Sequence, residues 1–127
     1  GQDDLPPVSA RKILGENAII GYSTHNLEQL KKAIKLPIDY VAIGPVFATK
    51  TKENPDETIG IEIVEQARKI IGDFPLVAIG GMNSTNFLEV LSSGANSAAI
   101  ISDLLSEPKK IAEKYTLLKT TINKVKI

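Results

Sequence analysis

The sequence predicts a single α/β domain over residues 1–127, in which a parallel sheet is flanked by helices. Four short apolar runs, each rich in β-forming residues, are typical of strands and lie at residues 18–22, 40–44, 76–79 and 97–101. Each run is almost continuously apolar, which indicates strands that are covered on both faces. Helical patterns fill the gaps between the runs, and strict alternation of helix and strand favours parallel strands joined by right-handed crossovers.

Five helices are predicted around these strands. They cover residues 8–14, about 26–34, 63–71, about 84–91, and a closing helix with its tail within 106–127. Prolines before and a glycine after the first stretch are typical helix boundaries. Asn26 and Gln29 form a predicted capping pair for the second helix. The closing helix carries one apolar stripe that we expect to pack on the body of the protein, made of Ile111, Tyr115, Leu118, Ile122 and Val125.

A regular repeat of strand and helix is also what half of a (β/α)8 TIM barrel contains, with a doubly wound sheet as the alternative. Polar and glycine residues follow the predicted strand ends, at 23–25, 49–52, 80–81 and 102. Barrel active sites are built at that end of the strands. The pattern therefore favours the barrel, with four strands and five helices making roughly its second half.

Composition limits the classes of partner. Fifteen basic and fifteen acidic side chains cancel, so no global field attracts nucleic acid or an anionic membrane. The chain has no cysteine, which suits a reducing cytosol. It also contains no apolar run long enough to span a membrane and no export signal at its start. We expect a cytoplasmic protein that binds small molecules.

Two loops are candidate anion sites. In the first, two hydroxyls alternate with two ammonium groups at Thr49, Lys50, Thr51 and Lys52, a set that suits phosphate, although a solvated basic loop explains it too. In the second, Gly80 and Gly81 end a strand before a helix, where bare N–H groups approach a phosphate. Ile101 and Ser102 end the next strand in the same way. Tight turns are the alternative interpretation of this second set.

Two further groups of residues are candidates for function, and each also has a structural interpretation. Asp3 and Asp4 suit Mg²⁺ shared with substrate phosphates, but helix capping and dipole complementarity explain them without a metal. No nucleophile elbow surrounds Ser23, which argues against covalent catalysis. His25 is the only histidine, and such a residue is more often a hydrogen-bonding loop residue than a base.

Taken together, five fragments resemble the thiamine-phosphate synthase family: residues 1–6, 21–25, 42–52, 77–81 and 101–102. Residues 44–52, GPVFATKTK, are the most specific fragment, because the related thiazole tautomerases usually lack this lysine pattern. The resemblance covers residues 1 to about 105. It implies a (β/α)8 barrel transferase of thiamine biosynthesis that requires Mg²⁺. This enzyme joins 4-amino-2-methyl-5-(diphosphooxymethyl)pyrimidine to thiazole phosphate, giving thiamine phosphate and pyrophosphate.

The resemblance also implies roles for individual residues. Asp4 matches a magnesium ligand, while Ser23 and Lys52 match contacts to the pyrimidine diphosphate and are the catalytic candidates. The remaining matches are contacts to the thiazole phosphate: Thr49, Lys50, Thr51, Gly81, Ile101 and Ser102. A departing diphosphate needs charge stabilisation more than acid–base groups, which agrees with a single histidine.

The resemblance implies the C-terminal portion of such an enzyme only, since the family's first half carries further pyrimidine and magnesium contacts. We therefore expect this portion alone to be inactive, and either to associate with itself or to bind a complementing N-terminal half. Two alternatives remain open at this point. One is a thiazole tautomerase relative with His25 as the proton-transfer base, and the other is a catalytically silent half-barrel.

Overall fold

A computed structural model describes residues 1–49 and 57–125 and contains an α/β fold around one parallel sheet. In chain order the elements are α1 (Pro7–Leu14), β1 (Gly21–Thr24), α2 (Leu27–Ala33), β2 (Tyr40–Ile43), α3 (Ile61–Ile71), β3 (Leu76–Ile79), α4 (Phe87–Ser92), β4 (Ser97–Ala99), α5 (Ser102–Leu105), the short 3₁₀ helix η1 (Pro108–Lys110) and α6 (Ile111–Val125). The predicted α/β class and parallel sheet are confirmed.

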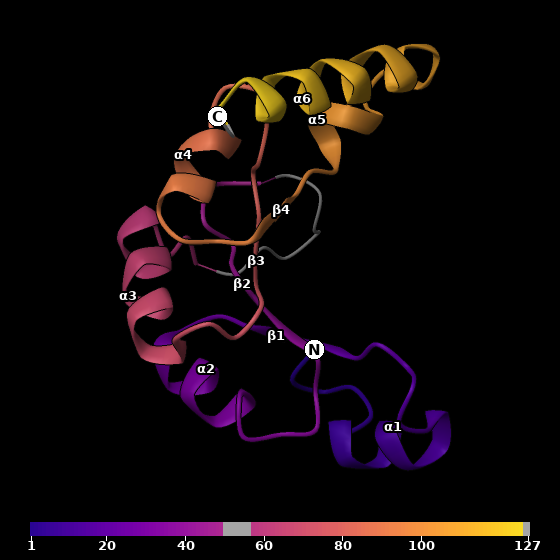
Figure 1. The fold of residues 1–127 in the computed structure, drawn as a ribbon, viewed down its shortest axis with the longest axis vertical. Coiled ribbons are helices and arrows are strands. Elements are labelled where there is room, and N and C mark those ends of the chain that lie inside the picture. Colours follow the sequence, from indigo (N-terminus) through magenta and orange to yellow (C-terminus); the bar gives the residue numbers. More distant parts are fainter. Residues whose placement is uncertain (50–56, 126–127) are drawn as a thin grey trace.

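The four strands lie side by side in the order in which they occur in the sequence, β1-β2-β3-β4. A doubly wound sheet reverses its strand order at a switch point, and the described strands contain no such reversal. Figure 1 shows α2, α3 and α4 together on one side of the strands, with α1 and α6 at the two ends of the arc. Consecutive right-handed crossovers in one direction produce this arrangement.

The hydrophobic core lies between the sheet and these helices. Val41, Ile43, Leu76 and Ala78 are fully buried there, against side chains from α2, α3 and α4. Because side chains alternate along a strand, the residues between them face the other way. Of these, Ala42 is 8% exposed and Val77 is half-buried. The expectation that both sheet faces are covered is therefore wrong for the described residues, since helices cover one face only.

The first strand begins later than predicted, at Gly21 instead of residue 18. The backbone N–H of Asp39 donates to the Ile20 carbonyl at 2.7 Å, and side chains make the other bonds to the residues before the strand. Arg11 donates to the Ala18 carbonyl at 2.6 Å, and the Asp39 carboxylate accepts the Ile20 N–H at 2.7 Å. Arg11 and Asp39 also form an ion pair of 2.8 Å. The strand then extends to Thr24, so that Ser23 lies within the strand and not after it.

The helix predicted from residue 84 begins only at Phe87, because the residues before it form a polar turn. Asn83 Oδ1 accepts hydrogen bonds from the backbone N–H groups of Thr85 and Asn86, at 2.9 and 3.0 Å. Such side-chain bonds compete with helical ones and favour a turn. The sequence analysis also missed α5, a single turn of helix directly after β4.

The capping prediction for α2 is half right. Asn26 Oδ1 accepts the Gln29 N–H at 2.8 Å, as an N-cap should. The Gln29 side chain does not return the bond to Asn26 but accepts the His25 N–H at 2.8 Å. This hydrogen bond connects the start of α2 to the residue that follows β1.

The apolar stripe of α6 is only partly packed. Leu118 is buried and Ile111 and Ile122 are half-buried, but Tyr115 and Val125 are 54% and 60% exposed, so the expectation that the stripe packs on the body is met only in part. The reason is that β4 has no further strand beside it in the described part of the chain.

Among the described residues, no helix is both long enough and apolar enough to cross a membrane.

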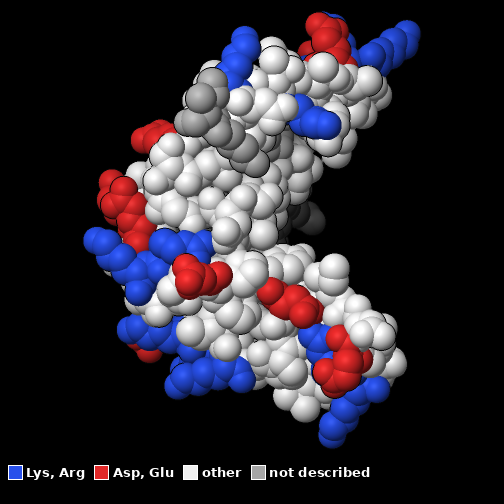
Figure 2. Space-filling view, in the orientation of Figure 1, with Lys and Arg blue, Asp and Glu red and all other residues white. Residues whose placement is uncertain are grey.

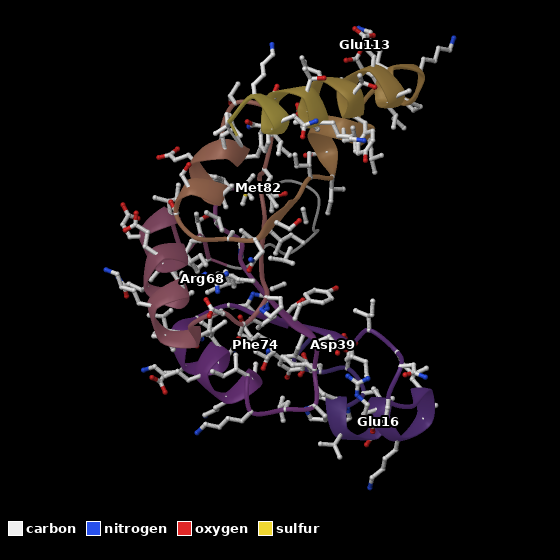
Figure 3. All side chains as sticks on the ribbon, viewed as in Figure 1. Glu16, Asp39, Arg68, Phe74, Met82 and Glu113 are labelled. Atoms are coloured by element: carbon white, nitrogen blue, oxygen red, sulfur yellow. The ribbon has the colours of Figure 1, made fainter. Side chains whose placement is uncertain are left out.

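Arg68 connects α3 to the residues that precede β3 and β4. Arg68 of α3 donates hydrogen bonds to the carbonyl oxygens of Gly94 at 2.7 Å and Phe74 at 2.9 Å. It also donates to the Gly72 carbonyl and to Asn96 Oδ1, each at 2.5 Å. Figure 3 shows Arg68 near Phe74, beside the strands. These bonds fix β3 and β4 relative to α3, at the end of the sheet opposite the candidate site.

Candidate functional site

One cavity of about 310 Å³ lies at the carboxyl ends of all four strands. Its lining contains hydroxyls and glycines among apolar residues: Gly1, Ser23, Thr24, His25, Gly44, Pro45, Thr49, Ile79, Gly80, Gly81, Met82, Ala99, Ile101 and Ser102. Small, concave sites with few polar groups are typical ligand sites. Figure 2 shows charged side chains mainly over the helices, with largely uncharged surface around the hollow of the arc.

The loops after β2 and β3 meet at two glycines on the wall of this cavity. Gly80 and Gly81 have φ values of +104° and +63°, and a side chain on either would collide with the facing loop. A Cβ at Gly80 would lie 2.5 Å from Pro45, and one at Gly81 would lie 2.4 Å from the Ala48 carbonyl oxygen. The Phe47 N–H donates to the Gly80 carbonyl at 3.1 Å. This contact brings Thr49 to the same cavity as the glycines.

The end of β1 is fixed to the neighbouring strand by side chains. Thr24 is 1% exposed, and its hydroxyl donates to the Ala42 carbonyl at 2.8 Å. His25 Nδ1 lies 2.8 Å from the Gly44 carbonyl oxygen, and since a carbonyl only accepts, Nδ1 carries the proton of this bond. The hydrogen-bonding role expected for His25 is thus present at the cavity wall.

Gln2 is a contributor that the sequence analysis missed. Its Nε2 donates to the Ser23 carbonyl at 2.7 Å, and its Oε1 accepts from the Tyr22 hydroxyl at 3.3 Å. These bonds hold the segment before α1 against the end of β1. No pattern in the sequence distinguishes such a glutamine from an ordinary surface residue.

Asp4 is exposed and does not belong to the cavity lining. Its carboxylate lies against Gly1. Gly1 itself lines the cavity, so Asp4 lies near its edge. No group of three or more potential metal ligands occurs among residues 1–49 and 57–125. One carboxylate completed by substrate phosphate oxygens still fits the ligand preference of Mg²⁺.

The cavity brings together most of the candidate site residues that the structure describes. Ser23 is half-buried in its wall, and Ile101 and Ser102, after β4, line the same cavity as the glycine loop after the neighbouring β3. Lys50, Thr51 and Lys52 lie outside the described residues. The roles of all these residues stay predictions. The lining also includes Met82 and Ala99, which no motif in the sequence indicated.

The fold and the position of the cavity define a class of protein: parallel α/β proteins whose ligand site lies at the carboxyl ends of the strands. Within that class, residues 1–104 match the thiamine monophosphate synthase family. The chain belongs to this family, which confirms the resemblance drawn from the sequence.

Curated relatives carry the same name. The chain is 48% identical over 115 residues to a thiamine-phosphate synthase of Koribacter versatilis, covering 91% of this chain and 54% of that protein. It is 44% identical over 108 residues to a thiamine-phosphate synthase of Dictyoglomus turgidum, covering 85% and 48% respectively. The chain thus spans about half the length of the curated relatives it matches.

Solved structures agree on the fold. A thiamine phosphate pyrophosphorylase from Pyrococcus furiosus aligns with a TM-score of 0.83 and 31% identity, over 98% of this chain and 58% of that one. A structure titled native KDPGal aligns with a TM-score of 0.73 at 14% identity, over 95% of this chain and 56% of that one, which supports the fold alone.

Proposed function

We propose that this chain forms the C-terminal half of a (β/α)8 barrel. Four parallel strands in sequential order, with helices on one face, are what half of such a barrel contains. The half-exposed second face of the sheet would be the interior of the barrel, and the open edges of β1 and β4 would be where the other half joins. The share of the Pyrococcus chain that aligns, 58%, supports this reading.

The function that the site supports best is thiamine-phosphate synthesis by the whole enzyme. The carbon–oxygen bond between the pyrimidine methylene and the diphosphate breaks, the thiazole nitrogen bonds to that methylene, and pyrophosphate leaves. The observation that carries this proposal is the single cavity in which Ser23, Thr49, Gly81 and Ser102 come together. Hydroxyls and backbone N–H groups arranged around one space suit the oxygens of a phosphate.

In this proposal Gly81, Ile101 and Ser102 bind the thiazole phosphate by N–H and hydroxyl groups, together with Thr49, Lys50 and Thr51. Ser23 and Lys52 hold the diphosphate, whose developing charge Lys52 stabilises as it departs. Asp4 supplies one carboxylate toward Mg²⁺. When bound, that ion neutralises diphosphate charge and aids its departure.

A chimera tests the proposal. The 115 matched residues of the Koribacter synthase are replaced by the matching part of this chain, and pyrophosphate release is measured with both substrates. We expect activity, and we expect Lys52→Ala to lower kcat by about 100-fold or more, as for the loss of one charge-stabilising donor. The matched control is Lys69→Ala on the exposed face of α3. A folded chimera without activity, or one that tolerates Lys52→Ala, contradicts the proposal.

The tautomerase alternative is not favoured, because the relatives matched here are named as synthases. The same chimera addresses it, since His25→Gln should leave pyrophosphate release largely intact if His25 holds the Gly44 carbonyl and moves no proton.

We further propose that residues 1–127 alone make no thiamine phosphate, and that they associate with a second copy or bind a complementing N-terminal half in the cytoplasm. Apolar side chains near the β1 edge support association, since Leu5, Ile13 and Ile19 are 57%, 72% and 81% exposed. Light scattering measures the mass of the chain in solution, alone and with a separately expressed N-terminal half of the Koribacter protein. A stable, active monomer contradicts this proposal.

A further inference from the structure

We propose that Asn86 is a positioning residue that sets the orientation of the Gly81 peptide in the phosphate cradle, an inference that rests on the proposed function. Asn86 lies directly before α4 and is not part of the cavity lining. Its Nδ2 donates a hydrogen bond of 3.0 Å to the carbonyl oxygen of Gly81, which does line the cavity. Asn86 therefore acts on a ligand through Gly81, without touching the ligand itself.

The Asn86 side chain is itself fixed by a reciprocal pair of hydrogen bonds. The Asn83 N–H donates to Asn86 Oδ1 at 2.9 Å, while the Asn86 N–H donates to Asn83 Oδ1 at 3.0 Å. The amide oxygen is thus held on one side and the amide nitrogen is left directed at Gly81. A side chain held at both ends loses little further entropy when it acts, which is what preorganisation requires.

The hydrogen bond to the Gly81 carbonyl also sets the direction of the N–H group in the same peptide unit. In a trans peptide the N–H points away from the carbonyl of the same unit. Phe47 N–H holds the Gly80 carbonyl, and Asn86 holds the Gly81 carbonyl. The N–H groups of Gly81 and Met82 therefore point away from these two hydrogen-bonded carbonyl groups. Both residues line the cavity.

The backbone freedom of Gly81 is the reason why its carbonyl needs a hydrogen-bond donor. Gly81 has φ of +63°, in a region where glycine moves freely between backbone conformations. Without a donor on its carbonyl, the peptide between Gly81 and Met82 is free to rotate and present its oxygen to the cavity. A carbonyl oxygen repels a phosphate oxygen, whereas an N–H binds it. Asn86 selects the orientation that binds an anion.

The same turn is also joined to the segment that follows β4. The Ser84 N–H donates to Asp103 Oδ2 at 3.1 Å, and Asp103 follows Ser102 in the first turn of α5. The Asn83 to Asn86 turn thus contacts the glycine loop through Asn86 and the Ser102 loop through Ser84. This double attachment holds the two proposed phosphate-binding loops at a fixed separation.

Nuclear magnetic resonance of the isotope-labelled chain with inorganic phosphate as the probe tests the inference. In the wild type we expect phosphate to shift the amide resonances of Gly81, Met82 and Ser102. Asn86→Ala should weaken phosphate binding about tenfold, the size of one lost net hydrogen bond, and remove the Met82 response. The matched control is Thr85→Val, which removes a hydroxyl bond in the same turn but does not touch Gly81.

Asn86→Asp is the second variant, because it keeps an oxygen for the Asn83 N–H and removes only the donor to Gly81. Its negative charge weakens phosphate binding as a whole, so the informative result is the difference between the responses of individual amides. The Gly81 carbonyl carbon should shift without phosphate, and at saturation Ser102 should respond while Met82 does not. Wild-type responses at Met82 in both variants overturn the role of Asn86 alone. A wild-type chain that binds no phosphate overturns the proposed cradle, and the inference with it.

Discussion

Replacing Arg68 with methionine is expected to lower the free energy of unfolding by about 2 to 3 kcal/mol. Arg68 makes four hydrogen bonds, but those to Gly72 and Asn96 are exposed, and water replaces the arginine there at little cost. The bonds to the carbonyls of Gly94 and Phe74 are partly buried. Each of these two acceptors loses a charged donor, worth about 1 to 1.5 kcal/mol where water has partial access. Methionine retains the aliphatic part of the side chain, so packing changes little.

The assay is urea unfolding followed by circular dichroism, at two protein concentrations so that any association is detected. Lys69→Met is the matched control, because it removes one positive charge from an exposed position on the same helix. That control should change stability by less than about 0.5 kcal/mol. If Arg68→Met and Lys69→Met have the same effect, the argument that Arg68 joins β3 and β4 to α3 is refuted.

Three further substitutions follow from single contacts. Gly81→Ala should cost about 1 to 2 kcal/mol for its left-handed backbone, and its Cβ, 2.4 Å from the Ala48 oxygen, should also abolish the phosphate response in a titration. Asn26→Ala removes the N-cap of α2 and should lower the urea midpoint by the equivalent of about 1 kcal/mol. A backbone N–H and then the Arg11 guanidinium hold the pKa of Asp39 below its usual 3.8. The wild type should therefore be more stable than Asp39→Asn above pH 3.8, and acid titration should remove that advantage as the pH falls through the lower folded pKa.

The fold class was predictable because its signal is local and repeated. Residues 76–79 were predicted as a strand with the observed bounds, since a buried central strand is apolar throughout. The start of β1 was not predictable, because it depends on Arg11 and Asp39, which lie 28 residues apart in the sequence. Apolar patterning also failed to separate a face covered by helices from one that is only half-buried, because both favour the same residue types. The apolar stripe of α6 likewise did not reveal that part of it is exposed, because its packing depends on what lies beside β4.

The candidate site divides in a similar way. Glycines, hydroxyls and a histidine after strand ends identified the part of the cavity where Ser23, His25, Gly81 and Ser102 lie. Parallel strands bring their carboxyl ends to one edge, so position in the sequence was enough. Gln2 and Asn86 were not predicted, because each acts through the carbonyl of another residue. Such contacts depend on how a turn folds, and residue type alone does not reveal that.

The sequence favours a phosphate contact at the glycine pair, and the structure adds a second reason why both residues are glycine. Carbonyls and side chains of the loop after β2 occupy the space where a Cβ on Gly80 or Gly81 would lie. Glycine is therefore needed for the two loops to pack, whether or not a ligand is bound. Because the loop after β2 also carries Thr49 into the cavity, close packing at the glycines sets the position of a hydroxyl on the facing wall. The segment GPVF and the glycine pair thus form one structural unit, in which a change on either side displaces proposed phosphate contacts on both.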